Sequence, residues 1–321
     1  MALVTNRNTF LGVGGEATYG TDGTVDRWLY AESITVDENT LIVPQPSMFQ
    51  AAGSSNDRWS SLGPVTVSIV AVLLPSYTGF GTILQAALGA LVTTGAGPYV
   101  HTNKLAASDA ASLTVEVPDG DSGNADTYAG WQVSTFEFAV EAGAVNYMKC
   151  TVGGLAQKWL SRTTTSTATF TGSGTPTPVL YYQNGNLAFN SANYLPKSYK
   201  LTGDHGYERT DVLGSQYTAQ PVKGKRGNYG ASMMLECTDT QYAALKAAQR
   251  AGTESDLTFT FTSGATSVAF NLHNAKIVTL SEPRSGAGKF TLTVTWKGFS
   301  DGTDEGVSVV VTNAQSSGLA V

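Results

Sequence analysis

Two long stretches of the chain carry the same order of hydrophobic and polar positions. In the first, apolar residues alternate with polar ones over 28–36, a long polar segment follows, and alternation resumes over 65–69. In the second, residues 199–201 and 231–235 flank another long polar segment. Alternation with a period of two predicts half-buried β-strands. The repeated order therefore predicts two modules of one kind.

A single amphipathic helix is expected after the second strand of each module. Apolar residues recur at helical spacing over 80–88 and over 242–248. Asp239 is a suitable N-cap for the second helix. Gly89 and Gly252 stand where the two helices should end.

Further strands complete each module. The alternating positions over 113–117 match those over 257–261, and each module ends in a hairpin, around residues 142–144 and around residues 285–288. Asn184-Gly185 predicts a tight hairpin near the start of the second module, because both central residues of such a turn adopt positive φ.

These patterns predict an all-β fold, a β-sandwich or barrel with one short helix per module, in two tandem copies. The first module is the longer one, and we expect its extra residues in a loop between 91 and 128. The predicted parts are an N-terminal arm (1–27), module 1 (28–160), a linker (161–179), module 2 (180–300) and a C-terminal arm (301–321).

Composition agrees with a β-rich protein that has many turns. Glycine contributes 35 of 321 residues, whereas charged residues are only 14%. The net charge of -6 disfavours tight nucleic-acid binding, which requires clustered Lys and Arg. Cys150 and Cys237 fall at different places in the two modules, which favours free thiols. The first ten residues lack the apolar core of a signal peptide, and the longest apolar stretch, 65–74, is too short for a membrane span.

Glycine-rich segments that bind nucleotides in other proteins have simpler interpretations here. Residues 12–17 fit a dinucleotide glycine pattern, but residues 18–23 cannot open the helix that the motif requires. Residues 286–289 resemble half of a phosphate loop, and a hairpin turn explains them better.

Metal and catalytic motifs are equally weak. An acidic turn at 119–126 lacks the Gly and Glu of a calcium loop. His101, His205 and His273 are scattered without ligand-like spacing. We therefore predict no catalytic residue, no metal site and no cofactor.

The two long polar segments, 40–63 and 204–227, occupy equivalent places in the modules. Loops of this length are usually functional or disordered. Lys223, Lys225 and Arg226 form a basic cluster that is either a solvated loop or a contact with carboxylates of an adjacent subunit. The residues predicted to make contacts between stacked copies are Asp37, Glu38, Arg58, Asp204, Glu208, Asp211, Lys223, Lys225 and Arg226.

The chain resembles one known family in several features together. These are Gly-Glu-Ala-Thr-Tyr-Gly-Thr at residues 15–21, the long β-loop-β pattern, the single helix and the terminal hairpin with a glycine turn. They resemble the tail tube (major tail) proteins of long-tailed bacteriophages over most of the chain, in two copies. The fold of that family is similar to the tube protein of type VI secretion systems.

The resemblance implies a structural virion protein without enzymatic activity, a tail subunit of a siphovirus that is assembled in the bacterial cytoplasm. Inner strands of neighbouring modules would join into a β-barrel around a lumen, and a chain with two modules would close a pseudo-hexameric ring with three copies. Rings would stack into a tube around a tape-measure protein, beside other tail proteins and without a membrane partner. Double-stranded DNA would then pass through the lumen into the host without specific binding, which an acidic protein favours.

Two other functions stay open from the residues. One is a two-domain β-sandwich adhesin or carbohydrate-binding surface protein, with Trp59, Tyr181 and Tyr182 as its contacts. The other is a hydrolase that uses carboxylates, although no two carboxylates are paired at a credible site.

Overall fold

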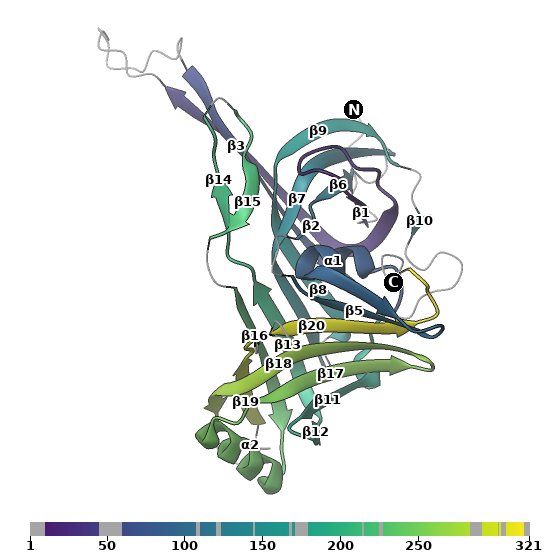
Figure 1. The fold of residues 1–321 in the computed structure, drawn as a ribbon, viewed down its shortest axis with the longest axis vertical. Helices are drawn as coiled ribbons and strands as arrows, with labels where there is room; N and C mark the ends of the chain where they lie inside the picture. The colour runs from purple at the N-terminus through teal and green to yellow at the C-terminus, as the bar shows by residue number, and fades with distance from the viewer. Residues whose placement is uncertain are drawn as a thin grey trace.

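The computed structural model describes residues 10–44, 60–106, 110–119, 123–143, 145–166, 169–170, 179–213, 215–224, 227–282, 291–300, 302 and 306–317. Within these residues the fold is all-β with two short α-helices, as predicted (Figure 1). A set of long, twisted strands runs through the molecule. α1 lies among the strands and α2 lies at one end (Figure 1).

The elements of the first half are, in chain order, β1 (Phe10–Gly15), β2 (Arg27–Pro44), β3 (Ser60–Leu73), α1 (Gly81–Leu88), β4 (Gly89–Thr94), β5 (Tyr99–Leu105), β6 (Leu113–Pro118), β7 (Asn124–Glu141), β8 (Val145–Ala156), β9 (Lys158–Thr164) and β10 (Thr169–Phe170). Those of the second half are the 3-10 helix Tyr182–Asn184, β11 (Gly185–Phe189), β12 (Ala192–Tyr194), β13 (Pro196–Asp204), β14 (Tyr207–Thr210), β15 (Ala219–Lys223), β16 (Asn228–Glu236), α2 (Asp239–Ala251), β17 (Ser255–Ser263), β18 (Thr266–Ser281), β19 (Thr291–Lys297) and β20 (Val307–Asn313).

Eight strands form one antiparallel sheet, which we call the central sheet. Its order is β2-β3-β8-β7-β13-β16-β19-β18. The first four strands come from the first half of the chain and the last four from the second half. The order β2-β3-β8-β7 is repeated as β13-β16-β19-β18, and the pairing of β7 with β13 joins the two sets.

The remaining strands repeat in the same way. In the first half β1 pairs with β6, β6 with β7, and β7 with β9. In the second half β11 pairs with β17, β17 with β18, and β18 with β20. Thus β7 and β18 each belong both to the central sheet and to an outer sheet of their own half.

Each half also has a hairpin of its own. The extra residues of the first half, expected in a loop, form the hairpin β4–β5, which pairs with β20 of the second half. The second half has the separate hairpin β14–β15 within its long polar segment. The predicted arms contain the strands β1 and β20, each of which is paired in an outer sheet. The domain limits given above remain predictions.

Both helices lie where the periodicity predicts them. α1 ends at Gly89, whose φ of 98° is unfavourable for other residues. α2 begins one residue earlier than its predicted cap suggests. Its N-cap is Thr238, which forms a capping box with Gln241 and leaves Asp239 in the first turn. Gly252 ends α2 in the left-handed conformation.

The hairpin predicted at Asn184-Gly185 lies a few residues further on. Asn184 ends a short 3-10 helix and Gly185 begins β11. The turn between β11 and β12 uses Asn190 and Ser191, which have φ values of 49° and 61°. Asparagine tolerates this region better than most residues, so Asn190 serves the purpose expected of the Asn-Gly pair.

Alternation places one face of the central sheet in the hydrophobic core. In β19, Leu292, Val294 and Trp296 are buried, whereas Thr293 and Lys297 point away from the core and are exposed. Buried residues of both halves form one continuous core cluster, so the halves share their interior. Cys150 and Cys237 are free thiols, and burial raises the pKa of Cys150 well above its usual range.

The Gly-Glu-Ala-Thr-Tyr-Gly-Thr segment has a structural role. The Glu16 carboxylate accepts hydrogen bonds from Ser112 Oγ (2.6 Å), Thr114 Oγ1 (3.0 Å) and the backbone N–H groups of Gly130 (2.6 Å) and Gly20 (3.0 Å). One side chain therefore joins the segment after β1 to β6 and β7.

Candidate assembly interface

The pairing of β7 with β13 is the junction between the two halves of the central sheet. It runs without a break from Ser198 opposite Glu141 to Asp204 opposite Thr135. The backbone continues it at both ends, because His205 N–H donates to Ser134 O (2.9 Å) and Ala142 N–H donates to Lys197 O (2.8 Å).

Close packing and one ion pair support this junction. A Cβ atom at Gly203 would lie 2.2 Å from the Phe136 ring, so the ring needs glycine opposite it. Lys200 of β13 forms an ion pair with Glu137 of β7 at 2.7 Å. His205, at the end of β13, donates to Ala87 O of α1 and accepts from Tyr229 Oη at 3.0 Å.

The two outer strands of the central sheet have open edges. In the described part of the chain, β2 pairs only with β3 beyond Ala31, and β18 pairs only with β19 over residues 277–281. Unpaired backbone N–H and C=O groups at a sheet edge are a template for another strand. β2 and β18 hold the positions in their halves that β13 and β7 hold at the junction.

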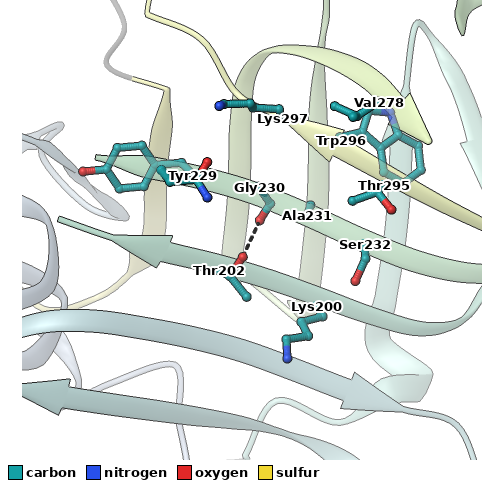
Figure 2. A pocket seen from close by; sticks show the side chains of 11 residues that line it. Lys200, Thr202, Tyr229, Gly230, Ala231, Ser232, Val278, Thr295, Trp296 and Lys297 are labelled. Carbon is teal, nitrogen blue, oxygen red and sulfur yellow. Dashed lines mark hydrogen bonds between the residues drawn. The ribbon is translucent and has the colours of Figure 1, made fainter. Parts of the chain in front are cut away.

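The face of the central sheet that points away from the core is polar. Lys200, Thr202, Ser232, Thr295 and Lys297 are among the residues that line a depression of about 310 Å³ on this face. Figure 2 shows these side chains on neighbouring strands. Neighbouring depressions on the same face extend across β7, β8 and β13. Hydroxyl and charged side chains line all three depressions, and we call this surface the polar face.

Most lysines of the polar face are neutralised by carboxylates. Lys149 pairs with Glu32 at 2.6 Å, and Lys197 pairs with Glu236. Lys200 pairs with Glu137, as noted above. Exposed ion pairs add little stability, but each one cancels a positive charge on the surface. Asp37, Glu141, Asp204 and Lys297 also lie on this face, which leaves an excess of negative charge.

The predicted contact residues fall into two groups. Asp37 and Glu38 lie on the open edge of β2. The other predicted contact residues that the structure describes lie on the β14–β15 hairpin or next to it in the chain: Asp204, Glu208, Asp211 and Lys223. Arg58, Lys225 and Arg226 lie outside the described residues.

The second group makes contacts within the chain. Lys223 Nζ donates to Ala106 O at 2.9 Å, and Asp211 pairs with Arg209 at 2.7 Å. Asp204 accepts a hydrogen bond from Gly206 N–H at 2.8 Å. In the first group, Glu38 lies near Tyr128, whose pKa rises to about 12 because of burial and then of the negative charges of Asp126 and Glu38.

Hydrogen bonds attach the β14–β15 hairpin to the first half of the chain. Val65 N–H donates to Gln216 O at 2.9 Å, and Gln157 Nε2 donates to Thr218 O at 3.0 Å. Arg209 also donates to Thr66 Oγ1. The hairpin lies along β3, towards the end of the molecule opposite α2 (Figure 1).

Two apolar side chains at the tip of this hairpin escaped sequence reasoning. Val212 is 51% exposed and Leu213 is fully exposed. Two adjacent apolar residues within a polar segment were the signal that could have identified them.

The residues considered for other chemistry have structural contacts. Asp119 and Asp126 both bind Arg162, with 3.0 Å between Arg162 Nη1 and Asp126 Oδ2. In the described part of the chain no three His, Cys, Asp or Glu side chains gather as a metal site would require. Tyr182 donates to Pro196 O, Tyr181 is partly exposed, and Trp59 lies outside the described residues.

The fold is that of an all-β protein whose central sheet has two open edges in its described part. Comparison with known families identifies it further: a family model described as phage tail tube protein matches residues 6–298. The chain belongs to this family. It is a non-enzymatic component of the virion tail that assembles with copies of itself into a stacked tube.

The search of curated proteins found no match. Among the described helices, neither is long and apolar enough to cross a membrane. The family assignment gives no support to the adhesin or hydrolase alternatives.

Proposed function

We propose that three copies of this chain close into one pseudo-hexameric ring of a siphovirus tail tube. The observation that carries this proposal is the junction of β7 with β13. β18 is the equivalent of β7, β2 is the equivalent of β13, and both have open edges. The contact made within the chain can therefore be repeated between chains. A contact of this head-to-tail kind forms a ring when its rotation closes.

The repeated pairing order further supports a tandem duplication of one tube module. Each half supplies four strands to the central sheet in the same order. Two such halves in one chain halve the number of copies that a six-module ring needs, which is why we propose three chains.

The polar face would line the lumen of the tube. Its hydroxyl groups and paired lysines offer few cations to a phosphate backbone, and its excess carboxylates repel phosphate. A tape-measure protein would fill this channel during assembly in the host cytoplasm. Double-stranded DNA would pass through the channel into the next host without specific binding.

Stacking of rings would use the hairpins that extend from one end of the central sheet. The β14–β15 hairpin is held against β3 and presents Val212 and Leu213 at its tip. Exposed apolar side chains of this kind favour burial against another surface. The tip is therefore a better candidate for the contact between rings than Lys223, which bonds within the chain.

Electron microscopy of purified protein tests the proposal. After concentration or seeding with preformed tails, negatively stained samples should show rings or hollow tubes with an open lumen. Monomers that persist under all these conditions would contradict the proposed ring.

A further inference from the structure

Two β-bulges, one in each half of the central sheet, show which residues of the two halves are equivalent. β7 has an irregular step between Val133 and Thr135, and β18 has one between Ile277 and Thr279. Each step faces two consecutive residues of the neighbouring strand, β8 or β19. Thr135 and Thr279 therefore occupy equivalent positions.

The first half relates this frame to β2. Val133, just before the bulge, lies opposite Gly154 of β8. On its other side Gly154 lies opposite Ile69 of β3. Ile69 in turn lies opposite Val36 of β2.

The second half relates the same frame to β13. Ile277, just before the bulge of β18, lies opposite Trp296 of β19. Trp296 lies opposite Ala231 of β16, which lies opposite Leu201 of β13. Val36 and Leu201 are therefore equivalent, and the register of one junction can be transferred to the other.

We infer that β18 of one copy pairs antiparallel with β2 of a second copy in the register of the β7–β13 junction. The inference rests on the proposed ring and specifies its contact. Within the chain, Thr135 lies opposite Asp204. The transferred register places Thr279, Leu280 and Ser281 opposite, respectively, Asn39 of the partner subunit, Glu38 of the partner subunit and Asp37 of the partner subunit.

A compensating change in side-chain size supports this register. Within the chain the bulky Phe136 faces Gly203, which has no side chain to collide with the ring. In the transferred pair the smaller Leu280 takes the place of Phe136. A side chain is then tolerated opposite it, where Glu38 of the partner subunit stands.

Polar groups are complementary in the next pair. Ser281 Oγ–H can donate to the carboxylate of Asp37 of the partner subunit. The equivalent pair within the chain sets Glu137 of β7 opposite Thr202 of β13. There Thr202 Oγ1 donates to Gly230 O and Glu137 pairs with Lys200, so what the two junctions share is a carboxylate and a hydroxyl at facing positions.

The edge of β18 has a backbone acceptor ready for the partner. At the junction within the chain, Ser134 O in the bulge accepts the N–H of His205 (2.9 Å). Its equivalent, Val278 O, accepts a hydrogen bond from Gln249 Nε2 at 3.4 Å, which leaves the second lone pair of this oxygen for the partner. The N–H of Thr40 of the partner subunit would donate to Val278 O, and the Val278 side chain, 54% exposed, would be covered.

Cysteine cross-linking tests the register directly. The Glu137–Thr202 pair alternates with the hydrogen-bonded pair of Ser134 and His205, so it is a non-hydrogen-bonded pair, the closer kind in an antiparallel sheet. A protein with Asp37→Cys and Ser281→Cys, in a Cys237→Ser background, should form disulfides between chains when assembled samples are mildly oxidised. Denaturing gels without reductant should show linked dimers and closed trimers.

Two matched controls keep Ser281→Cys and move the other cysteine by two residues. Thr35→Cys and Asn39→Cys stay on the same face of β2 but are diagonal to position 281, beyond the usual reach of a disulfide. If tubes form and one of these pairs links more efficiently than the Asp37 pair, the register is wrong while the proposed ring stands. If the wild type forms no ring, the proposed function itself fails.

Hydrogen exchange of the wild type gives a readout that no substitution can disturb. Peptides covering residues 34–40 and 277–282 should exchange at least tenfold more slowly in tubes than in monomers. Equal exchange in both states, or protection already present in the monomer, would overturn the inference.

Discussion

At the residue scale, single polar side chains join segments that are far apart in the sequence. Glu16 joins the segment after β1 to β6 and β7 through four hydrogen bonds. His205 joins the end of β13 to α1 and β16. All of these contacts lie within one chain, so replacing Glu16 or His205 should change the stability of the monomer.

Replacing Glu16 by alanine should lower the free energy of unfolding by about 2–3 kcal/mol, because four donors lose a charged acceptor. Chemical denaturation of the monomer measures this. Glu32→Ala removes the carboxylate of an exposed ion pair with Lys149 and should cost less than about 1 kcal/mol. Equal effects of the two substitutions would show that the Glu16 contacts have no special role.

The stability of the monomer should depend on pH through His205. Burial lowers the pKa of His205 and Lys223 lowers it further, against the opposing effects of the Ala87 carbonyl and Asp204. In the unfolded chain the His205 side chain has its ordinary pKa of about 6.5. The stabilisation is therefore complete above about pH 6.5 and is lost as the pH falls through the lower pKa of the folded state.

Thermal unfolding between pH 5 and pH 8 checks this for the wild type and for His205→Gln. The difference in stability between the two proteins should shrink as the pH is lowered below about 6.5. A constant difference over the whole range would contradict a neutral, buried His205.

At the element scale, the β7–β13 pairing is the feature on which the two halves depend. Substituting Gly203 by alanine introduces a Cβ into the Phe136 ring and should destabilise the monomer by about 1–3 kcal/mol. Gly15→Ala is the matched control, because a Cβ at the end of β1 meets no atom within 4 Å.

The same position allows a double-mutant cycle. Phe136→Leu reproduces the smaller side chain found at Leu280 and should restore part of the stability lost in Gly203→Ala. Strictly additive losses would contradict the compensation on which the transferred register relies.

Sequence patterns identified the helices and strands better than they identified which strands correspond in the two halves. Period-two alternation identified β19, and the apolar stripe with Gly89 identified α1, because both signals are local. The match of residues 113–117 to 257–261 was displaced by two positions. Strand pairing makes Val115 the equivalent of Leu257, because each is the first paired residue after the register shift of its strand, opposite Tyr128 of β7 and Leu272 of β18.

The candidate interface was predictable only in part. Asp37 and Glu38 were expected at the start of the first long loop, but β2 continues through both residues to Pro44 and pairs with β3. The docking of β14–β15 on β3 depends on contacts such as that of Arg209 with Thr66, which are 143 residues apart. No local pattern encodes such a contact, so the segment was expected to be free for other copies.

At the scale of the whole molecule, a substitution at the tip of the β14–β15 hairpin can test the stacking of rings without disturbing the folding of the monomer. Leu213→Ser changes a fully exposed side chain and should alter monomer stability by less than about 0.5 kcal/mol. Tubes grown from this variant should be shorter in electron micrographs. Val222→Ser on β15, half-exposed and away from the tip, is the control and should leave tube length unchanged. Tubes of normal length from Leu213→Ser would exclude the tip from the contact between rings.

The central claim is that one chain supplies two modules whose shared sheet is completed by other copies. The mass of a single ring, measured by native mass spectrometry after tubes are dissociated into rings, tests it most directly. We predict a mass equal to three chains. A ring of six chains, or a particle that remains a single chain under assembly conditions, would contradict it.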